Sequence, residues 1–298
     1  MAGVEPPEER DRQATEVGSG PTALRIVLGT QLRRLREAAE ISRPDAGYSI
    51  RGSGSKISRM ELGRVGFKER DVADLLTLYG VTDDGERSEF LDMVRRSHEP
   101  GWWHRYTDLM PTWFQDYVGL EESASRIQTY ELQFVPGLMQ TEAYALAIAS
   151  RGRPQHASQD ARRRVTLRMQ RQRVLAGTDA PRLWAVIDES VLHRPIGGRE
   201  TMLAQLDHLL EITKRPNVTL QVVPYRLSGY SAEGAFTMLR FAEPELPHLV
   251  YIEHLAGAMY LDKLEEIEQY SRVFDRLTVD AETPDISRQM LMKIRTEM

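Results

Sequence analysis

Residues 23–64 alternate helix-forming runs with chain-breaking residues in an order that few folds accommodate. The run 23–39, ALRIVLGTQLRRLREAA, repeats an apolar residue every three or four positions, which predicts a helix with one apolar face. A short second helix is expected over 43–50, because Ser42 offers an N-cap side chain and Pro44 falls in the first turn, where its missing N–H costs nothing. Two helices are therefore expected before residue 51, and the second is much shorter than the first.

The stretch 49–64, SIRGSGSKISRMELGR, places flexible residues directly ahead of a short basic run. Gly52 and Gly54 are expected to supply a turn that needs a positive φ, and Ser53 to cap a third helix. Helix, short helix, tight turn and helix is the order of a helix-turn-helix motif. The sequence therefore predicts that motif over these residues.

In such a motif the third helix presents its N-terminal end to a DNA groove, where small residues allow a close approach. Ile57 and Met60 lie three positions apart and would hold this helix on the core, so that Ser55, Lys56 and Arg59 face the groove. The alternative is an ordinary helical bundle in which a capped helix exposes basic residues to solvent. Cap, turn, basic surplus and apolar spacing would then have to coincide by chance, so DNA contact is the favoured interpretation.

The positive charge of the chain is concentrated in this region. The whole sequence carries a formal net charge of −5, which taken alone argues against a nucleic-acid-binding protein. Residues 25–70, however, hold eleven Lys and Arg residues against five Asp and Glu residues, so the rest of the chain is strongly acidic. A basic block in an acidic chain is expected of a module that contacts phosphates, here those of double-stranded DNA.

The stretch 32–64 also resembles a known family. Its sequence, LRRLREAAEISRPDAGYSIRGSGSKISRMELGR, is similar to the helix-turn-helix of the lambda-repressor-like, or xenobiotic-response-element, regulators of bacteria. The resemblance places Arg43 where that family has a phosphate-contacting Gln, and Glu61 where an acid buttresses the fold. The candidate DNA-binding residues are Arg43, Ser53, Ser55, Lys56, Arg59 and Arg64.

The sequence departs from the family pattern at two places. Gly47 replaces the expected Ala, and Arg51 followed by Gly52 stands where Gly and an apolar residue are usual. Gly inside a helix costs about 1 kcal/mol relative to Ala. The second helix is therefore expected to be weakly formed without DNA.

Two further helices, expected over 68–79 and 84–97, would complete an all-α, five-helix domain at 21–98. Residues 1–20 are acidic, are interrupted by Pro and Gly, and offer no apolar face to bury. These residues are expected to form a disordered tail rather than a signal peptide.

The stretch that follows is unusually aromatic. Residues 99–120 hold three of the four Trp residues of the chain, Trp102, Trp103 and Trp113. Such density could form a ligand box, but an inter-domain packing seam that buries large aromatic area is the favoured interpretation. We therefore expect a linker here that transmits the state of the second domain to the DNA-binding one.

Residues 121–298 are expected to form a regulatory and dimerisation domain of α+β class, with a small sheet flanked by helices. The pattern over 120–149 is helical with a turn at 135–137, and the arginine-rich run 161–176 has only a narrow apolar stripe. A solvated, dimer-facing helix is favoured for that run over a second DNA-contacting element. The remaining expected elements are strands over 182–188, 218–225, 235–241 and 249–254, and helices over 199–214, 261–277 and 284–298.

This second half carries a resemblance of its own. The stretches WFQDYVGLEESASRIQTYELQFVPGLMQTEAYA, RPNVTLQVVPY and GAFTMLRF are similar to the uncharacterised domain that follows such helix-turn-helix modules in antitoxin-like regulators of high-GC bacteria. The resemblance implies a regulator that is often paired with a small partner protein encoded nearby. It supplies no ligand and no catalytic residue.

An enzyme that processes a ligand, fused to a DNA-binding module, is the alternative function. The sequence contains no HExxH, GxSxG or P-loop pattern, no Cys, and no clustered metal-ligand spacing, so neither a metal nor a cofactor is expected. Glu253 and His254 would form an acid/base pair only inside a pocket, and a surface pair is the favoured interpretation. No run approaches the roughly 18 apolar residues of a membrane helix. The chain is therefore expected to be a cytoplasmic, homodimeric transcriptional regulator, and no enzyme.

Overall fold

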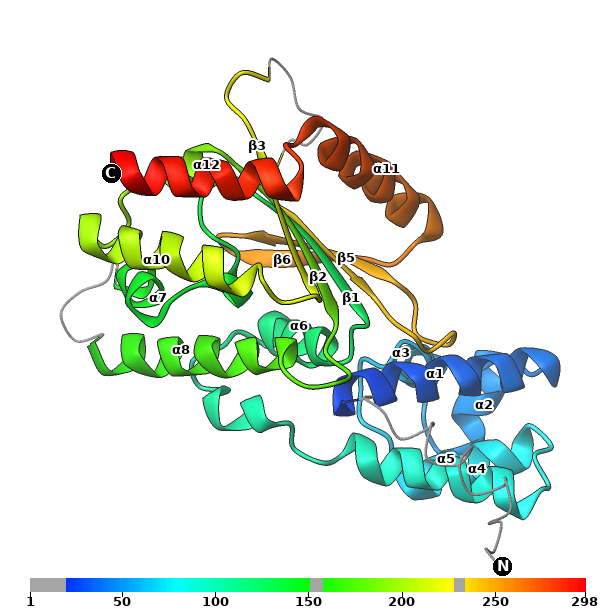
Figure 1. The fold of residues 1–298 in the computed structure, drawn as a ribbon. Coiled ribbons are helices and arrows are strands. Elements are labelled where there is room, and N and C mark those ends of the chain that lie inside the picture. Colours follow the sequence, from blue (N-terminus) through cyan, green and yellow to red (C-terminus); the bar gives the residue numbers. More distant parts are fainter. Residues whose placement is uncertain (1–19, 151–157, 228–233) are drawn as a thin grey trace, which may run out of the picture. The chain divides into compact units, whose positions relative to one another are not determined.

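The computed structural model describes residues 20–150, 158–227 and 234–298. The chain divides into two compact units, Met1–Gly101 and Trp102–Met298 (Figure 1). The disordered tail expected at 1–20 lies, except for Gly20, outside the described residues.

The first unit consists of helices, as the sequence predicts. Leucines 28 and 32 of the first helix pack with Ile57, Met60 and Leu75 in one apolar cluster, and each of these side chains is at most 2% exposed. The predicted five-helix domain is confirmed. Its helices are α1 (Pro21–Ala38), α2 (Arg43–Ser49), α3 (Gly54–Glu61), α4 (Glu69–Leu78) and α5 (Asp84–Ser97).

Side-chain caps begin the two short helices. The Ser42 hydroxyl accepts a hydrogen bond from the Asp45 backbone N–H, and the Ser53 hydroxyl accepts one from the Lys56 backbone N–H, both at 3.2 Å. Each cap satisfies a backbone donor that the helix itself leaves unpaired. The chain direction at the start of α3 is therefore fixed by Ser53.

The turn between α2 and α3 differs from the expectation. Neither Gly52 nor Gly54 has a positive φ, and the left-handed residue is Arg51, with φ of 53°. The Gly52 backbone N–H bonds to the Gly47 carbonyl at 2.8 Å, which closes the C-terminus of α2 around this left-handed residue. The prediction that the glycines supply the left-handed turn is wrong.

Gly47 has a packing role that the sequence did not reveal. A Cβ atom at this position would lie 2.5 Å from the carbonyl carbon of Ser53, closer than two such atoms can approach. Only a glycine lets α2 come so near the start of α3. The lower helix propensity of Gly47 is therefore accepted in exchange for the close packing of α2 against the start of α3.

The second unit contains a six-stranded mixed sheet in the order β3-β2-β1-β4-β5-β6. Strands β1, β2 and β3 are parallel, and β4, β5 and β6 continue the sheet antiparallel. The predicted α+β class, a sheet flanked by helices, is confirmed. The strands are β1 (Arg126–Glu131), β2 (Arg182–Asp188), β3 (Val218–Val223), β4 (Phe236–Arg240), β5 (Leu249–His254) and β6 (Gly257–Leu261).

Helices cover both faces of this sheet. On one face, Phe274 and Leu277 pack with Tyr130 and Val186 and are fully buried. On the other face, the ring of Tyr117 lies 4.1 Å from that of Tyr251, centroid to centroid. Helix α12 runs beside α10 (Figure 1). The α-helices are α6 (Thr112–Glu122), α7 (Glu142–Ala149), α8 (Ser158–Arg171), α9 (Ser190–His193), α10 (Arg199–Ile212), α11 (Leu264–Asp280) and α12 (Pro284–Glu297), and the 3-10 helices are η2 (Trp102–Tyr106), η3 (Gly137–Met139) and η5 (Gln172–Leu175).

Two strands were not expected. Strand β1 lies inside a stretch predicted to be helical, and it pairs with β2 on one side and β4 on the other. Its buried Gln128 and Thr129 bind Arg240 and Thr237 of the neighbouring strand, so polar residues occupy positions where apolar alternation would have revealed a strand. Strand β6 (Gly257–Leu261) has no fully buried residue and therefore shows no apolar alternation in the sequence.

The arginine-rich helix α8 is not solvated as predicted. Ala161, Val165 and Leu167 are each 4% exposed, and the helix packs on α7 and on the 3-10 helices η2 and η3. Three of its arginines bind acceptors inside the unit, namely Arg163 with Asp108, Arg168 with Gln140 and Arg171 with Glu121. The apolar stripe appears narrow in sequence because paired arginines occupy part of the buried face.

Candidate nucleic-acid interface

Helix α3 separates apolar from polar residues as the sequence predicts. Ile57 and Met60 are each 1% exposed and hold the helix on the core of the first unit. Ser55 and Arg59 are exposed. The side of α3 turned away from the core therefore presents a hydroxyl and a guanidinium to solvent.

The exposed candidate residues differ in whether their side chains already have a partner within the protein. Ser53, Ser55, Arg59 and Arg64 are all exposed, and the Ser53 hydroxyl is occupied as the cap of α3. Within the described part of the chain, no carboxylate lies within 4 Å of the guanidinium of Arg59 or Arg64. These two cations are available for phosphate or base contact without breaking an ion pair.

Lys56 has a partner within the protein. Its Nζ atom lies 2.5 Å from Oδ2 of Asp71 on α4, and the two side chains are 32% and 12% exposed. The lysine therefore joins α3 to α4 in the free protein. A DNA phosphate would have to compete with Asp71 for this ammonium group.

Arg43 belongs to a buried ion-pair network centred on Glu61. The Glu61 carboxylate, 3% exposed, accepts hydrogen bonds from Arg36 Nε at 2.5 Å and from Arg43 Nε at 2.9 Å. The hydrogen bond to Glu61 raises the pKa of Arg36 above its ordinary value. Because Arg43 is 43% exposed, its guanidinium is fixed by Glu61 at one edge and open to solvent at the other.

Two exposed residues of the motif and one buried residue beneath it escaped the sequence reasoning. Tyr48 on α2 is 86% exposed, and Arg51 is exposed in the turn that leads to α3. The spacing of apolar residues in the sequence predicts neither the exposure of the Tyr48 ring nor the left-handed conformation of Arg51. The role of Arg36 as the buried partner of Glu61 could be found only from its contact across the fold.

The predicted aromatic seam is packed inside the second unit. Trp103 is 2% exposed and clusters with Tyr106, Val118 and Leu167, while Trp113 stands edge-on to Phe114. An inter-domain role for these residues stays a prediction.

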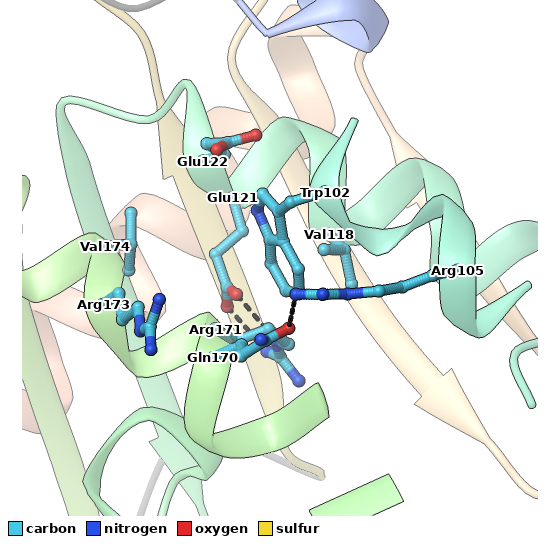
Figure 2. A pocket seen from close by; sticks show the side chains of 9 residues that line it. All are labelled: Trp102, Arg105, Val118, Glu121, Glu122, Gln170, Arg171, Arg173 and Val174. Carbon is cyan, nitrogen blue, oxygen red and sulfur yellow. Dashed lines mark hydrogen bonds and ion pairs between the residues drawn. The ribbon is translucent and has the colours of Figure 1, made fainter. Parts of the chain in front are cut away.

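Trp102 lines a cavity of about 340 Å³ (Figure 2). One wall is the ion pair of Glu121 and Arg171, whose two hydrogen bonds are 2.8 Å long. Arg105 donates to Gln170 beside it at 2.9 Å. Burial raises the pKa of Glu122 in the same cavity, and a hydrogen bond with Trp102 opposes the shift.

Two different family models match the two units of the chain. The family model described as "Helix-turn-helix domain" matches residues 27–90, which span most of α1, all of α2, α3 and α4, and the first half of α5. The model described as "Domain of unknown function (DUF5753)" matches residues 114–293, more than half of the chain. The chain belongs to the DUF5753 family. No curated protein and no solved structure matches it.

The helix-turn-helix match indicates that this DUF5753 protein is a DNA-binding regulator. The DUF5753 region includes all six strands of the sheet and begins inside α6. No helix among the described residues is long and apolar enough to cross a membrane.

Glu253 and His254 end β5 within the DUF5753 region. The Glu253 carboxylate accepts a hydrogen bond from the Tyr251 hydroxyl at 3.0 Å, and His254 is exposed. Among the described residues there is no hydrogen bond between Glu253 and His254, and no group of three or more His, Asp or Glu side chains could hold a metal ion.

Proposed function

We propose that this chain is a sequence-specific transcriptional regulator of the lambda-repressor-like and antitoxin-like kind, and that α3 reads its operator. The observation that carries the proposal is the polarity of α3 within a helix-turn-helix domain. Ile57 and Met60 fix the helix on the core while Ser55 and Arg59 face outward. A recognition helix needs this arrangement, because its side chains read base edges only when its opposite face is held by the domain.

Homodimerisation through the DUF5753 region is part of the proposal. One helix-turn-helix module covers about one half-site, and two-fold proteins read half-sites about 34 Å apart. Sedimentation of the full chain, whose mass is 34.1 kDa, measures this directly. A mass of one chain, both free and bound to its duplex, contradicts the dimer.

Control of DNA binding is assigned to a partner protein or a ligand that acts through the DUF5753 region. The small partner protein is inferred from the family resemblance. The aromatic residues Trp102, Trp103 and Trp113 would report and transmit its binding. Such an effector changes operator affinity only by its differential affinity for two arrangements of the protein, typically about 1–3 kcal/mol.

A binding role, rather than catalysis, is proposed for the DUF5753 region in a cytoplasmic protein that needs no cofactor. The local chemistry at β5 supports this, because Glu253 is bonded to Tyr251 and not to His254.

The experiment for sequence-specific binding is selection from a randomised DNA duplex library with the full chain. Enrichment of one motif is expected, with two copies related by a dyad if the protein is a dimer. A pool that binds but stays random in sequence after repeated rounds contradicts sequence-specific reading.

A further inference from the structure

A second and larger cavity lies in the second unit. Its volume is about 750 Å³, and it is lined by residues 108–111, by residues of α6, α7 and α8, and by Glu253, His254 and Leu255 at the end of β5. Sites for small molecules typically have volumes of about 300–1,000 Å³. The cavity is therefore large enough to hold a small organic molecule.

Eleven of the seventeen residues that line the cavity are apolar or aromatic, and the other six are Arg, Asp, Glu or His residues. Trp113 and Phe114 supply rings that stand edge-on to each other at 6.0 Å between centroids. Aliphatic side chains from α7 and α8 lie in the same lining, including Ile148 and Val165. This part of the cavity suits the hydrocarbon or aromatic body of a ligand.

The charged part of the lining contains a guanidinium group that has no carboxylate partner among the described residues. Arg168 donates Nη1 to the Gln140 side chain at 2.7 Å, and no described carboxylate lies within 4 Å of its guanidinium. Arg164 and Arg171 of α8 also line the cavity, and Arg171 holds Glu121 with two hydrogen bonds.

The carboxylates near Arg168 do not fully neutralise it. Burial, and next the charge of Glu253, raise the pKa of Glu131 to about 8, so that this group carries a proton at pH 7. Glu253 lines the cavity and accepts a hydrogen bond from Tyr251, and its charge favours the charged form of Arg168 without an ion pair within 4 Å. Burial, followed by the charge of Arg171, lowers the pKa of Arg168 to about 10, and the guanidinium remains charged at neutral pH.

We propose that this cavity binds a small organic acid with an apolar body, whose anionic group pairs with Arg168 while its body packs on Trp113, Phe114 and Ile148. A buried cation gains most from a charge-assisted hydrogen bond to an anion, because water screens the interaction little. An alcohol of the same length would keep the apolar contacts and lose the ion pair. An amine would place a third cation beside Arg168 and Arg171.

Binding of the acid stands apart from the proposed DNA-binding function. A role of the acid as the effector of DNA binding would rest on that function, whereas its binding in the cavity does not. The binding assay therefore contains no DNA, and its failure would leave the reading of DNA by α3 untouched.

The test uses the full chain with 8-anilinonaphthalene-1-sulfonate as a fluorescent probe, displaced by decanoate, decanol or decylamine. We expect one saturable probe site per chain, and displacement by decanoate at a concentration about tenfold lower than by decanol or decylamine. Equal competition by the three compounds overturns the pairing with Arg168, and the absence of a saturable site overturns the ligand site itself.

Three variants locate the site, each checked for wild-type thermal unfolding. Arg168→Met should weaken decanoate binding about tenfold and leave decanol binding unchanged. Arg162→Met removes an exposed arginine of the same helix and should change neither. Ile148→Trp fills the cavity while retaining Arg168, so it keeps the test decisive if Arg168→Met does not fold. Unchanged probe binding in a folded Ile148→Trp variant overturns the proposal.

Discussion

The Nζ atom of Lys56 on α3 lies 2.5 Å from the Oδ2 atom of Asp71 on α4. The pair joins the helix expected to read DNA to the helix behind it, so Lys56 has a structural role whether or not it touches DNA. A loss of DNA binding on removing Lys56 would therefore mix two effects, and the two must be measured separately.

Replacing Lys56 with Met should lower the free energy of unfolding by about 1–2 kcal/mol, because the largely buried Asp71 then loses its cation. Asp71→Asn is the matched variant. It should lose a similar stability yet bind DNA at least as well as wild type, since it frees the Lys56 ammonium. Urea unfolding and duplex titration of both variants check this, and wild-type stability of Lys56→Met contradicts it.

Gly47→Ala should destabilise the first unit although Ala is the better helix former by about 1 kcal/mol. The added methyl would lie 2.5 Å from the Ser53 carbonyl carbon and must push α2 away from the start of α3. Tyr48→Ala, at an 86% exposed position of the same helix, is the control for helix propensity alone. A Gly47→Ala variant as stable as Tyr48→Ala would show that the close approach is not required.

Glu121→Gln should lower the free energy of unfolding by about 3–5 kcal/mol, because it leaves the buried guanidinium of Arg171 without its carboxylate. Asp108→Asn breaks the pair with Arg163, in which both side chains are exposed by more than a third, and should cost at most about 1 kcal/mol. Chemical unfolding of the two variants measures the contrast. Equal losses would mean that burial of the first pair has no energetic consequence.

The stability of the second unit should fall as the pH rises through the range between the ordinary pKa of a glutamate and that of Glu131. The folded state raises the pKa of Glu131 from 4.5 to about 8, mainly by burial and next by the charge of Glu253, while Arg168 opposes the shift. Between these values the folded state binds more protons than the unfolded state, so each rise in pH favours unfolding.

Glu131→Gln removes this titration. Its free energy of unfolding should exceed that of wild type by about 1–3 kcal/mol more at pH 8.5 than at pH 5. Unfolding measured at both values is the check. Parallel stability curves for the two proteins between these pH values would show that Glu131 has an ordinary pKa.

Local sequence patterns were sufficient to predict the helices of the first unit and the α+β class of the second unit. Ser42 and Ser53 cap α2 and α3 as their positions in the sequence predict, because a cap depends on residues only three positions apart. Strand β1 was missed because Gln128 and Thr129 are buried by bonds to residues more than a hundred positions away. Pairing over such distances leaves no local periodicity.

The candidate site was predictable to the same extent. The outward position of Arg59 follows from the spacing of Ile57 and Met60, which is a property of the helix itself. The pairing of Lys56 with Asp71, like that of Arg171 with Glu121, depends on how elements distant in sequence pack together. Sequence reasoning therefore identified which residues α3 exposes, but not which of its cations the fold already uses.

Titration of the selected DNA duplex with Arg59→Ala is the most direct test of DNA reading by α3. Arg59 is exposed, and no described carboxylate pairs with it, so its removal should leave the unfolding transition unchanged. We expect the dissociation constant to rise between about fivefold and a hundredfold, the equivalent of about 1–3 kcal/mol, while Arg272→Ala on α11 changes nothing beyond error. An Arg59→Ala protein that is folded and binds the duplex as tightly as wild type would contradict the assignment of α3 as the recognition helix.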